Sequence, residues 1–457
     1  MQTISRPHHE LHLAAFSHLC SSAFICGYTL GVARIVILGA GFAGLESATV
    51  LERELGSTAR CEITLVDQDN YFLFTPLLPQ IPSSFINPRH IVQPVRDIRG
   101  TRNFRFMRDV VRGMDPGSRR VELGSGRLEY DYLVVALGSR RNDFGVPGVG
   151  EHTFDFKTLE DAVTLREHVL DLCEHADHTE DATARGRMLT VVVVGGGYTG
   201  AELIAELQDF LFRYVVPRYR GIHRTDIQLM LLEATAKLLN NVDPALAAHA
   251  QRRLRREGIK LRPNSPVTRC LEGGVEIKGG EIIRAETVVW TAGIRAHELA
   301  AELSGPHDRI GRCVVNEYLQ LEGHPEIFVA GDCAASTAAP QAAAVVPTAI
   351  EQGRLAGRNI ARLLRGELLE RYVHSPRSMA VTLGMNYAVL SVGPVRIRGL
   401  LAWLAANAYH LYKLVGLKKQ VQVFLDWSLA YIFPRDASMV RKPRHCKFCE
   451  AAKRAGD

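Results

Sequence analysis

The chain has 457 residues and a formal net charge of +6, with 47% hydrophobic and 23% charged residues. This length exceeds what a single hydrophobic core serves and predicts two or three domains. The composition is ordinary for a folded α/β protein and argues against long disordered regions. Nine cysteines at irregular spacings argue against a secreted disulfide scaffold and favour a reducing compartment.

An extension precedes the first predicted strand. The segment 11–33 contains no Lys, Arg, Asp or Glu, but two histidines and several hydroxyl residues dilute its hydrophobicity. Because it runs into a strand at Arg34 without a linker, a signal peptide or membrane anchor is disfavoured. We expect residues 1–32 to be disordered, with Val32 as a second candidate for the start of translation.

A nucleotide-binding pattern begins at 34–38, a short apolar run followed by a glycine turn, a helical pattern and a second apolar strand at 62–66. This order predicts a βαβ unit that binds a dinucleotide. The first glycine makes the turn, the second admits the pyrophosphate to the helix N-terminus, and the third lets helix and strand pack closely. The acid that ends the second strand can accept both hydroxyls of an adenosine ribose. In chain order these residues are Gly39, Gly41, Gly44 and Asp67.

The same pattern recurs in mid-chain, where a strand at 190–194, a glycine turn and a helix precede a strand at 227–232. A carboxylate at Glu233 would repel a 2′-phosphate, which favours NADH over NADPH. The alternative for Asp67 and Glu233 is that each merely ends a strand at the surface. The corresponding residues of this second unit are Gly195, Gly197, Gly200 and Glu233.

Three further apolar strands are predicted, at 131–138, 287–293 and 326–332. The carboxylate that ends the last of them lies where open α/β sheets bind ligands. The terminal residues of these strands are Gly138, Gly293, Gly331 and Asp332.

Together these motifs resemble the flavoproteins with two dinucleotide-binding domains, and most closely the type II NADH:quinone oxidoreductases, over about 34–434. The resemblance implies FAD at the first glycine motif and NADH at the second. It also implies that Pro76 lies beside the flavin, that Asp332 binds its ribityl chain and that Glu202 lies near the nicotinamide and the quinone. Proton delivery by Glu202 is one hypothesis, and stabilisation of a helix N-terminus is the other. The segments that carry the resemblance are 39–44, 70–79, 195–203, 289–293, 329–334 and parts of 399–433.

We therefore predict an α/β fold with two Rossmann-type domains, for FAD and NADH, and a C-terminal amphipathic region that associates with a membrane. The expected FAD-binding domain is discontinuous, 33–150 and 312–376, and encloses an NADH-binding domain at 151–311. Residues 377–457 form the expected region for membrane association or dimerisation.

The basic excess of the chain lies in this C-terminal region. From Arg396 onward there are twelve Lys or Arg and four Asp or Glu, with five Trp or Tyr among them. Membrane-surface helices use this mixture, and its uncharged run at 399–412 is too short to cross a bilayer. We expect a homodimer bound to the anionic cytoplasmic face of the cell membrane, without affinity for nucleic acid. The alternative is a helix pair for dimerisation or core packing.

One segment departs from the family that the chain resembles. In the quinone-site signature, Ala-Gln-x-x-x-Gln before a glycine and helix, Pro347 and Glu351 replace the two glutamines and Gln352 remains beside them. We expect these three residues at the quinone site, and the alteration leaves the identity of the acceptor open. NADH would reduce FAD and a membrane quinone would reoxidise it, without proton pumping and without a nucleophile from the protein.

Two other functions remain open. A sulfide:quinone oxidoreductase needs reactive cysteines near the flavin, and Cys173 and Cys333, the candidates, are not well placed as a pair. A redox-sensing or partner-binding flavoprotein would bind NADH and turn over slowly with every quinone. The pair Cys446 and Cys449 has no second ligand pair to complete a metal site, so we expect no metal.

Overall fold

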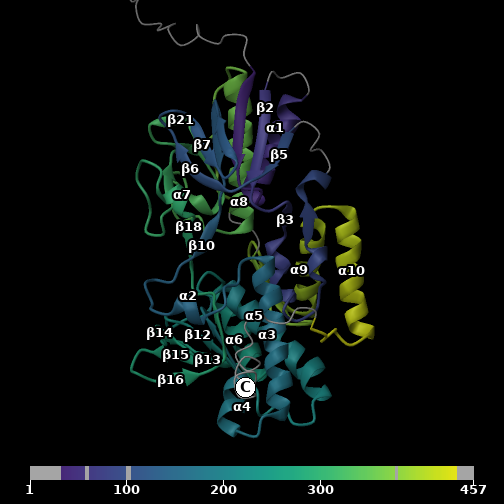
Figure 1. Cartoon of the computed structure of the whole chain (residues 1–457). Helices are drawn as coiled ribbons and strands as arrows, with labels where there is room; N and C mark the ends of the chain where they lie inside the picture. Colours follow the sequence, from purple (N-terminus) through teal and green to yellow (C-terminus); the bar gives the residue numbers. More distant parts are fainter. Residues whose placement is uncertain (1–31, 57–60, 99–103, 376–378, 440–457) are drawn as a thin grey trace, which may run out of the picture.

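The computed structural model describes residues 32–56, 61–98, 104–375 and 379–439 (Figure 1). The expected N-terminal extension, apart from Val32, lies outside these residues, as do Cys446 and Cys449. The chain forms two α/β halves, one above the other in Figure 1, with a pair of helices at one side.

The first half is built on an eight-stranded sheet in the order β22-β19-β20-β21-β9-β1-β2-β5. From β21 to β5 neighbouring strands run parallel, which requires helical or long crossovers between them. Two helices pack against each other beside this sheet, α1 (Phe42–Leu55) and α8 (Val346–Leu364). The strands are β1 (Ala33–Leu38), β2 (Cys61–Asp67), β5 (Phe104–Arg108), β9 (Tyr132–Val135), β19 (Cys313–Val315), β20 (Gln320–Leu321), β21 (His324–Val329) and β22 (Ala334–Ser336).

The second half has a four-stranded parallel sheet in the order β13-β12-β11-β17. Its strands are β11 (Thr190–Val194), β12 (Gln228–Leu232), β13 (Lys260–Arg262) and β17 (Thr287–Trp290). The helices of this half are α3 (Leu159–His178), α4 (Ala182–Met188), α5 (Tyr198–Phe210) and α6 (Pro244–Arg256). The α/β fold expected from the sequence is confirmed, and its four strands in the two nucleotide units are placed within one residue at each end.

Smaller elements complete both halves. Short antiparallel strands β10 (Ser139–Arg141) and β18 (Ile294–Ala296) pair where the chain passes between the halves. The others are β3 (Tyr71–Leu73), β4 (Val92–Pro94), β6 (Val111–Asp115), β7 (Arg120–Leu123), β8 (Gly126–Glu129), α2 (Val149–His152), β14 (Val267–Leu271), β15 (Gly274–Ile277), β16 (Ile282–Arg284) and α7 (Glu298–Ala301).

The C-terminal region is a three-stranded antiparallel sheet followed by two helices. The strands are β23 (Met379–Thr382), β24 (Ala388–Val392) and β25 (Val395–Gly399), and the helices are α9 (Leu400–Lys413) and α10 (Leu417–Ile432). The helices lie side by side, drawn in yellow in Figure 1. Within the described part of the chain, no helix combines the length and apolar character that crossing a membrane requires.

The contact between α1 and α8 depends on glycine. A Cβ added to Gly353 would lie 2.2 Å from the carbonyl oxygen of Ala43, and one added to Gly357 would lie 2.8 Å from that of Ser47. The hydroxyl of Ser47 donates to the carbonyl oxygen of Gly353 at 2.8 Å. Because α1 begins at the first glycine turn, this close approach also fixes the orientation of that turn.

Replacing Gly353 with alanine is expected to lower the free energy of unfolding by about 1–3 kcal/mol, because the added methyl group overlaps a backbone carbonyl. Gly186→Ala is the matched control, since a Cβ there would meet nothing within 4 Å, and it should leave stability equal or slightly higher. Denaturant titration of the two variants measures the difference. Equal stability of Gly353→Ala and the parent protein would contradict the inferred contact.

Candidate functional site

The first glycine turn is closed by the acid that ends β2. The amide of Ala40 donates to Oδ2 of Asp67 at 2.5 Å. Gly39 has a φ of 97°, and a Cβ there would lie 2.3 Å from the carbonyl oxygen of Ala136. A Cβ at Gly44 would lie 1.8 Å from the carbonyl oxygen of Gly39, so only glycine lets α1 pack against the turn.

The second glycine turn repeats each of these relations. The amide of Gly196 donates to Oε2 of Glu233 at 2.9 Å. Gly195 has a φ of 110°, and a Cβ at Gly200 would lie 2.0 Å from the carbonyl oxygen of Gly195. The two units are therefore alike in geometry as well as in sequence, and both acids border a turn instead of only ending a strand.

Each turn leads to a helix N-terminus that no side chain caps. Gly41 precedes α1 and Gly197 precedes α5, and neither helix start has a side-chain hydrogen bond. A Cβ at either glycine would meet nothing within 4 Å. Backbone amides at a helix start favour an anionic group, and open space in front of them fits a pyrophosphate. Both turns thus fit a dinucleotide.

Asp332 lies in the 3-10 turn Gly331–Cys333 that follows β21. Its Oδ2 accepts a hydrogen bond from the hydroxyl of Ser139 at 2.6 Å and lies 4.0 Å from Nζ of Lys157. Burial lowers the pKa of Lys157, and the charge of Asp332 opposes that shift. Sequence reasoning missed Ser139 and Lys157. Ser139 directly follows a predicted strand end, which was a usable signal, whereas Lys157 lies in no motif.

The expected quinone-site residues lie at the start of α8. Gln352 is buried, and its Oε1 accepts a hydrogen bond from the amide of Gly331 at 2.8 Å. Pro347 is half-buried in the first turn of the helix, and Oε2 of Glu351 lies 3.7 Å from Nδ1 of His374. The side-chain oxygen of Gln352 is therefore engaged in holding the turn that carries Asp332.

The other expected cofactor residues lie at the ends of neighbouring segments. The carbonyl oxygen of Gly138 accepts hydrogen bonds from Sγ of Cys333 at 3.0 Å and from the amide of His297 at 3.1 Å. The carbonyl oxygen of Gly293 accepts from the amide of Asn142 at 3.0 Å. Pro76 lies in the first turn of the 3-10 helix Thr75–Gln80. Gly138 thus shares the turn of Asp332.

Glu202 belongs to a row of carboxylates on one face of α5. Its Oε1 accepts hydrogen bonds from the amide and the hydroxyl of Thr382, at 2.9 and 3.0 Å. Burial raises the pKa of Glu202 to about 7, and the neighbouring Glu206 adds to the shift. Asp209, one turn further, pairs with Nε of Arg213 at 3.0 Å and accepts from the amide of Met385. The spacing of i, i+4 and i+7 was a signal for the two acids that sequence reasoning missed.

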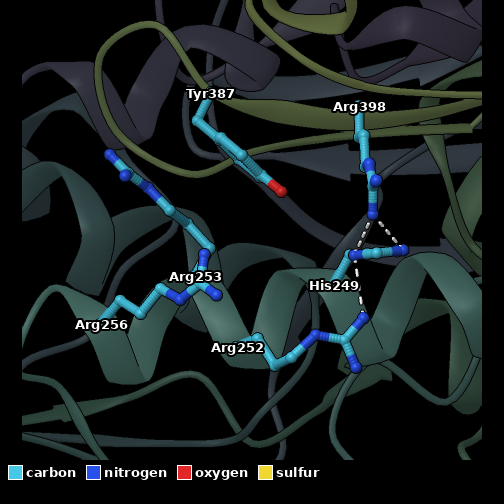
Figure 2. Close-up of a pocket in the computed structure, with 6 residues that line it drawn as sticks. All are labelled: His249, Arg252, Arg253, Arg256, Tyr387 and Arg398. Atoms are coloured by element: carbon cyan, nitrogen blue, oxygen red, sulfur yellow. Dashed lines mark hydrogen bonds between the residues drawn. The ribbon is translucent and has the colours of Figure 1, made fainter.

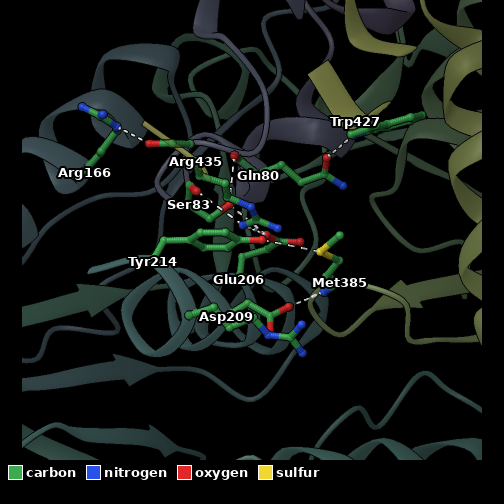
Figure 3. Close-up of polar contacts among 11 residues, drawn as sticks. Gln80, Ser83, Arg166, Glu206, Asp209, Tyr214, Met385, Trp427 and Arg435 are labelled. Atoms are coloured by element: carbon green, nitrogen blue, oxygen red, sulfur yellow. Dashed lines mark hydrogen bonds and ion pairs between the residues drawn. The ribbon is translucent and has the colours of Figure 1, made fainter. Parts of the chain in front are cut away.

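Glu206 faces an arginine from the end of the described chain (Figure 3). Arg435 follows α10 and is buried, with Nη1 3.4 Å from Oε2 of Glu206 and its guanidinium 4.1 Å from the centre of the Phe85 ring. Ser83 donates its hydroxyl to the same carboxylate oxygen at 2.8 Å. Burial raises the pKa of Glu206 to about 7, and the charge of Arg435 opposes that shift.

One face of α9 turns polar atoms toward the interior. Nε1 of Trp403, Oδ1 of Asn407 and Nδ1 of His410 are buried and lack a hydrogen-bond partner among the described residues. The His410 ring lies 6.3 Å from that of Phe74. Burial lowers the pKa of His410 to about 4, so its ring is neutral at neutral pH. In α10, Nε1 of Trp427 donates to Oε1 of Gln80 at 2.8 Å.

The outer faces of α9 and α10 expose apolar side chains. The exposed fraction of Leu401 and of Ile432 is 72% each. Lysines 413, 418 and 419 stand at the turn between the helices. The other large apolar side chains exposed on this pair are Leu400, Leu404, Tyr409, Tyr412, Leu417, Val421, Phe424, Leu425, Leu429 and Tyr431.

The two cysteines considered for a sulfide reaction are not reactive thiolates. Cys173 and Cys333 are buried free cysteines, and burial raises the pKa of each thiol to about 12. A nucleophilic cysteine needs the opposite shift. The structure therefore does not support sulfide oxidation by this pair.

Comparison with known proteins agrees with this geometry. The family model for pyridine nucleotide-disulphide oxidoreductases matches residues 33–353. The curated type II NADH:quinone oxidoreductase Ndh of Mycobacterium tuberculosis is 31% identical over 423 residues, which are 88% of this chain and 89% of that protein. Among solved structures, NDH2 from Plasmodium falciparum in complex with NADH has a TM-score of 0.81 at 17% identity and covers 89% of this chain and 100% of that one. The sulfide:quinone oxidoreductase of Aquifex aeolicus shares the fold less closely, with a TM-score of 0.68 at 20% identity and coverage of 88% and 96%.

Two glycine turns, two ribose-side acids and an aspartate at a third strand end define a flavoprotein of the pyridine nucleotide-disulphide oxidoreductase class, which binds FAD and NADH. Within that class the chain belongs to the type II NADH:quinone oxidoreductase family. It is an oxidoreductase that carries electrons from NADH through FAD to a quinone.

Filling either space in front of a helix start should separate the two cofactors. Gly41→Val is expected to fold with about tenfold weaker FAD binding, because its side chain occupies the phosphate position of α1. Gly197→Val should keep its flavin and raise KM for NADH about tenfold for the same reason at α5. Flavin absorbance per protein and steady-state kinetics measure both effects. Full flavin content in Gly41→Val would contradict the assignment.

Proposed function

We propose that the first turn holds FAD, the second holds NADH, and electrons pass to a membrane quinone at the side covered by α9. The observation that carries this proposal is the pair of equivalent turns, each with an acid bonded to its backbone amide and an uncapped helix start. Bound FAD supplies the step between hydride transfer from NADH and electron transfer to the quinone. The protein contributes position, shielding from water and control of protons.

We assign the cofactor contacts to the residues at the turns and strand ends. Asp67 and Glu233 accept hydroxyls of the two adenosine riboses, and Asp332 holds the ribityl chain with Ser139 beside it. The FAD contacts are Gly39, Gly41, Gly44, Asp67, Pro76, Gly138, Gly331 and Asp332, and the NADH contacts are Gly195, Gly197, Gly200, Glu233 and Gly293. The corresponding domains are 33–150 with 312–376 for FAD, 151–311 for NADH and 377–457 for membrane association.

The quinone reaches the flavin beneath α9. A quinone offers two carbonyl acceptors on an apolar ring, and Trp403 and His410 present buried N–H groups beside aromatic rings. Burial keeps His410 neutral, so it donates without adding a charge. Pro347 and Glu351 border the same electron-acceptor side, while Gln352 holds the turn of Asp332.

Anaerobic mixing tests this function directly. NADH is expected to bleach the flavin absorbance within the mixing time of a stopped-flow instrument, and menaquinone or ubiquinone analogues should then restore it. Fast bleaching without recovery by either quinone would favour a redox-sensing or partner-binding flavoprotein. Absence of bleaching by NADH would contradict the assignment of the second turn.

Glu202 is positioned to deliver a proton to the reduced quinone. Its pKa of about 7 means that the carboxyl is protonated below this pH and loses its proton as the pH rises through it. Quinone turnover should therefore fall above about pH 7 in the parent protein. Glu202→Gln is expected to lower turnover about tenfold or more and to make it independent of pH between 6 and 8.

Thr382→Val provides the matched test of this role. The hydroxyl of Thr382 lowers the pKa of Glu202, so its removal should move the midpoint of the pH profile upward while activity at low pH is retained. Parallel rate measurements from pH 5 to 9 compare the three proteins. If Glu202→Gln keeps the turnover and the pH profile of the parent, proton delivery by this residue is excluded and helix stabilisation remains.

We propose that the exposed faces of α9 and α10 bind the anionic cytoplasmic face of the cell membrane. Their apolar side chains are exposed next to lysines, as in helices that lie in a membrane interface. A homodimer stays a prediction of the sequence, which light scattering of the detergent-solubilised protein checks.

Leu401→Glu with Ile432→Glu is expected to reduce binding to vesicles at least about tenfold, because two apolar side chains no longer enter the bilayer interface. Leu368→Glu is the control, since Leu368 is 87% exposed and lies far from this helix pair in the sequence. Co-sedimentation with vesicles containing phosphatidylglycerol measures binding. An equal loss in the control would show that added negative charge, and not the helix face, is responsible.

A further inference from the structure

A cavity of about 380 Å³ lies between α6 and the C-terminal sheet, away from both nucleotide turns (Figure 2). One wall comes from the last two turns of α6. The other comes from Tyr387, just before β24, and Arg398 of β25. The residues that line the cavity are His249, Arg252, Arg253, Arg256, Tyr387 and Arg398.

Positive charge in this cavity exceeds what the protein neutralises. Arg253 pairs with Glu257 at 2.6 Å and packs against the Tyr387 ring. The other three guanidiniums, of Arg252, Arg256 and Arg398, have no carboxylate within ion-pair distance in the described ranges 32–56, 61–98, 104–375 and 379–439. Like charges at this separation repel each other, and a bound anion would remove the repulsion.

His249 cannot satisfy the guanidiniums that face it. Nη2 of Arg252 lies 2.9 Å from its Nδ1, and Nη1 of Arg398 also contacts the ring. Burial and both arginines lower the pKa of His249, so the ring stays neutral and offers one acceptor nitrogen. Two guanidiniums thus share a single lone pair, and their remaining N–H donors face the cavity.

The strand register fixes this arrangement. Arg396 and Arg398 alternate with Ile397 along β25, so both arginines face α6. Arg396 pairs with Asp243 at the start of α6, at 2.6 Å. The same strand is therefore held to one end of α6 by an ion pair, while at the other end it meets only cations.

We propose that this pocket binds the phosphate group of a small anion and thereby clamps β25 to α6. Guanidinium forks match phosphate oxygens in paired hydrogen bonds, and the Tyr387 hydroxyl adds a donor. The site is separate from the proposed electron transfer, so neither depends on the other. Arg398 directly precedes Gly399 and the exposed start of α9, so a phospholipid headgroup and a free phosphate compound could both supply the group.

The test measures thermal unfolding of the flavin-loaded protein in sodium phosphate and in sodium chloride of equal ionic strength. Phosphate is expected to raise Tm by about 3 °C beyond chloride, and R252Q/R398Q should lose that increment. R220Q/R255Q is the matched control, which removes two exposed arginines outside the pocket and should keep it. NADH:quinone turnover without phosphate should be unchanged in R252Q/R398Q, which also shows that this variant folds. Should it not fold, calorimetric titration of Arg256→Gln with inorganic phosphate should show about tenfold weaker binding.

An equal Tm shift in phosphate and chloride, or the same phosphate increment in R252Q/R398Q as in the parent protein, would overturn the proposal. Vesicle co-sedimentation identifies the source of the phosphate group. If R252Q/R398Q binds phosphatidylglycerol vesicles more weakly than R220Q/R255Q, the group is a lipid headgroup. If the two variants bind these vesicles equally while the Tm difference holds, it is a soluble phosphate compound.

Discussion

A carboxylate bonded to a backbone amide inside a glycine turn is the constraint from which both halves of this molecule are built. Asp67 holds the amide of Ala40, and Glu233 holds that of Gly196. Each bond ties the end of the second strand to the start of the helix, so the bare helix N-terminus points to a fixed place. In the first half the constraint extends further, because α8 packs on α1 through Gly353 and its Gln352 holds the turn of Asp332. Phosphate, ribose and ribityl positions are thereby set by one connected backbone framework.

The second half contributes a different kind of order, along α5. This helix starts at the nicotinamide-side turn and carries Glu202, Glu206 and Asp209 on one face, beneath the C-terminal region. Burial holds the pKa of the first two near neutrality. The helix that receives NADH is thus also the helix that can hold protons, which a two-electron reduction of quinone consumes.

Local patterns allowed the sequence to predict most of the framework. Alternation of apolar strands, glycine turns and terminal acids placed Gly39, Asp67 and Glu233 correctly, because these features act between near neighbours in the chain. The sequence did not predict Lys157 beside Asp332 or Arg435 beside Glu206, since each pair joins segments more than 150 residues apart. The meaning of Gln352 also changed, because its partner, Gly331, is identified only when two separate elements meet. Long-range pairs of this kind leave no period in the sequence.

The return of the chain after α10 has a mechanical consequence. Arg435 lies between the rings of Phe85 and Tyr214 and closes over Glu206, so the apolar helix pair is anchored at its far end as well as through β25. Lifting the pair from the body of the protein would extract a guanidinium from its aromatic clamp and let water reach the acids of α5. Attachment to the bilayer and the dryness of the proton-holding face are therefore a single property, and a force that peels the protein from its membrane would also short-circuit its proton chemistry.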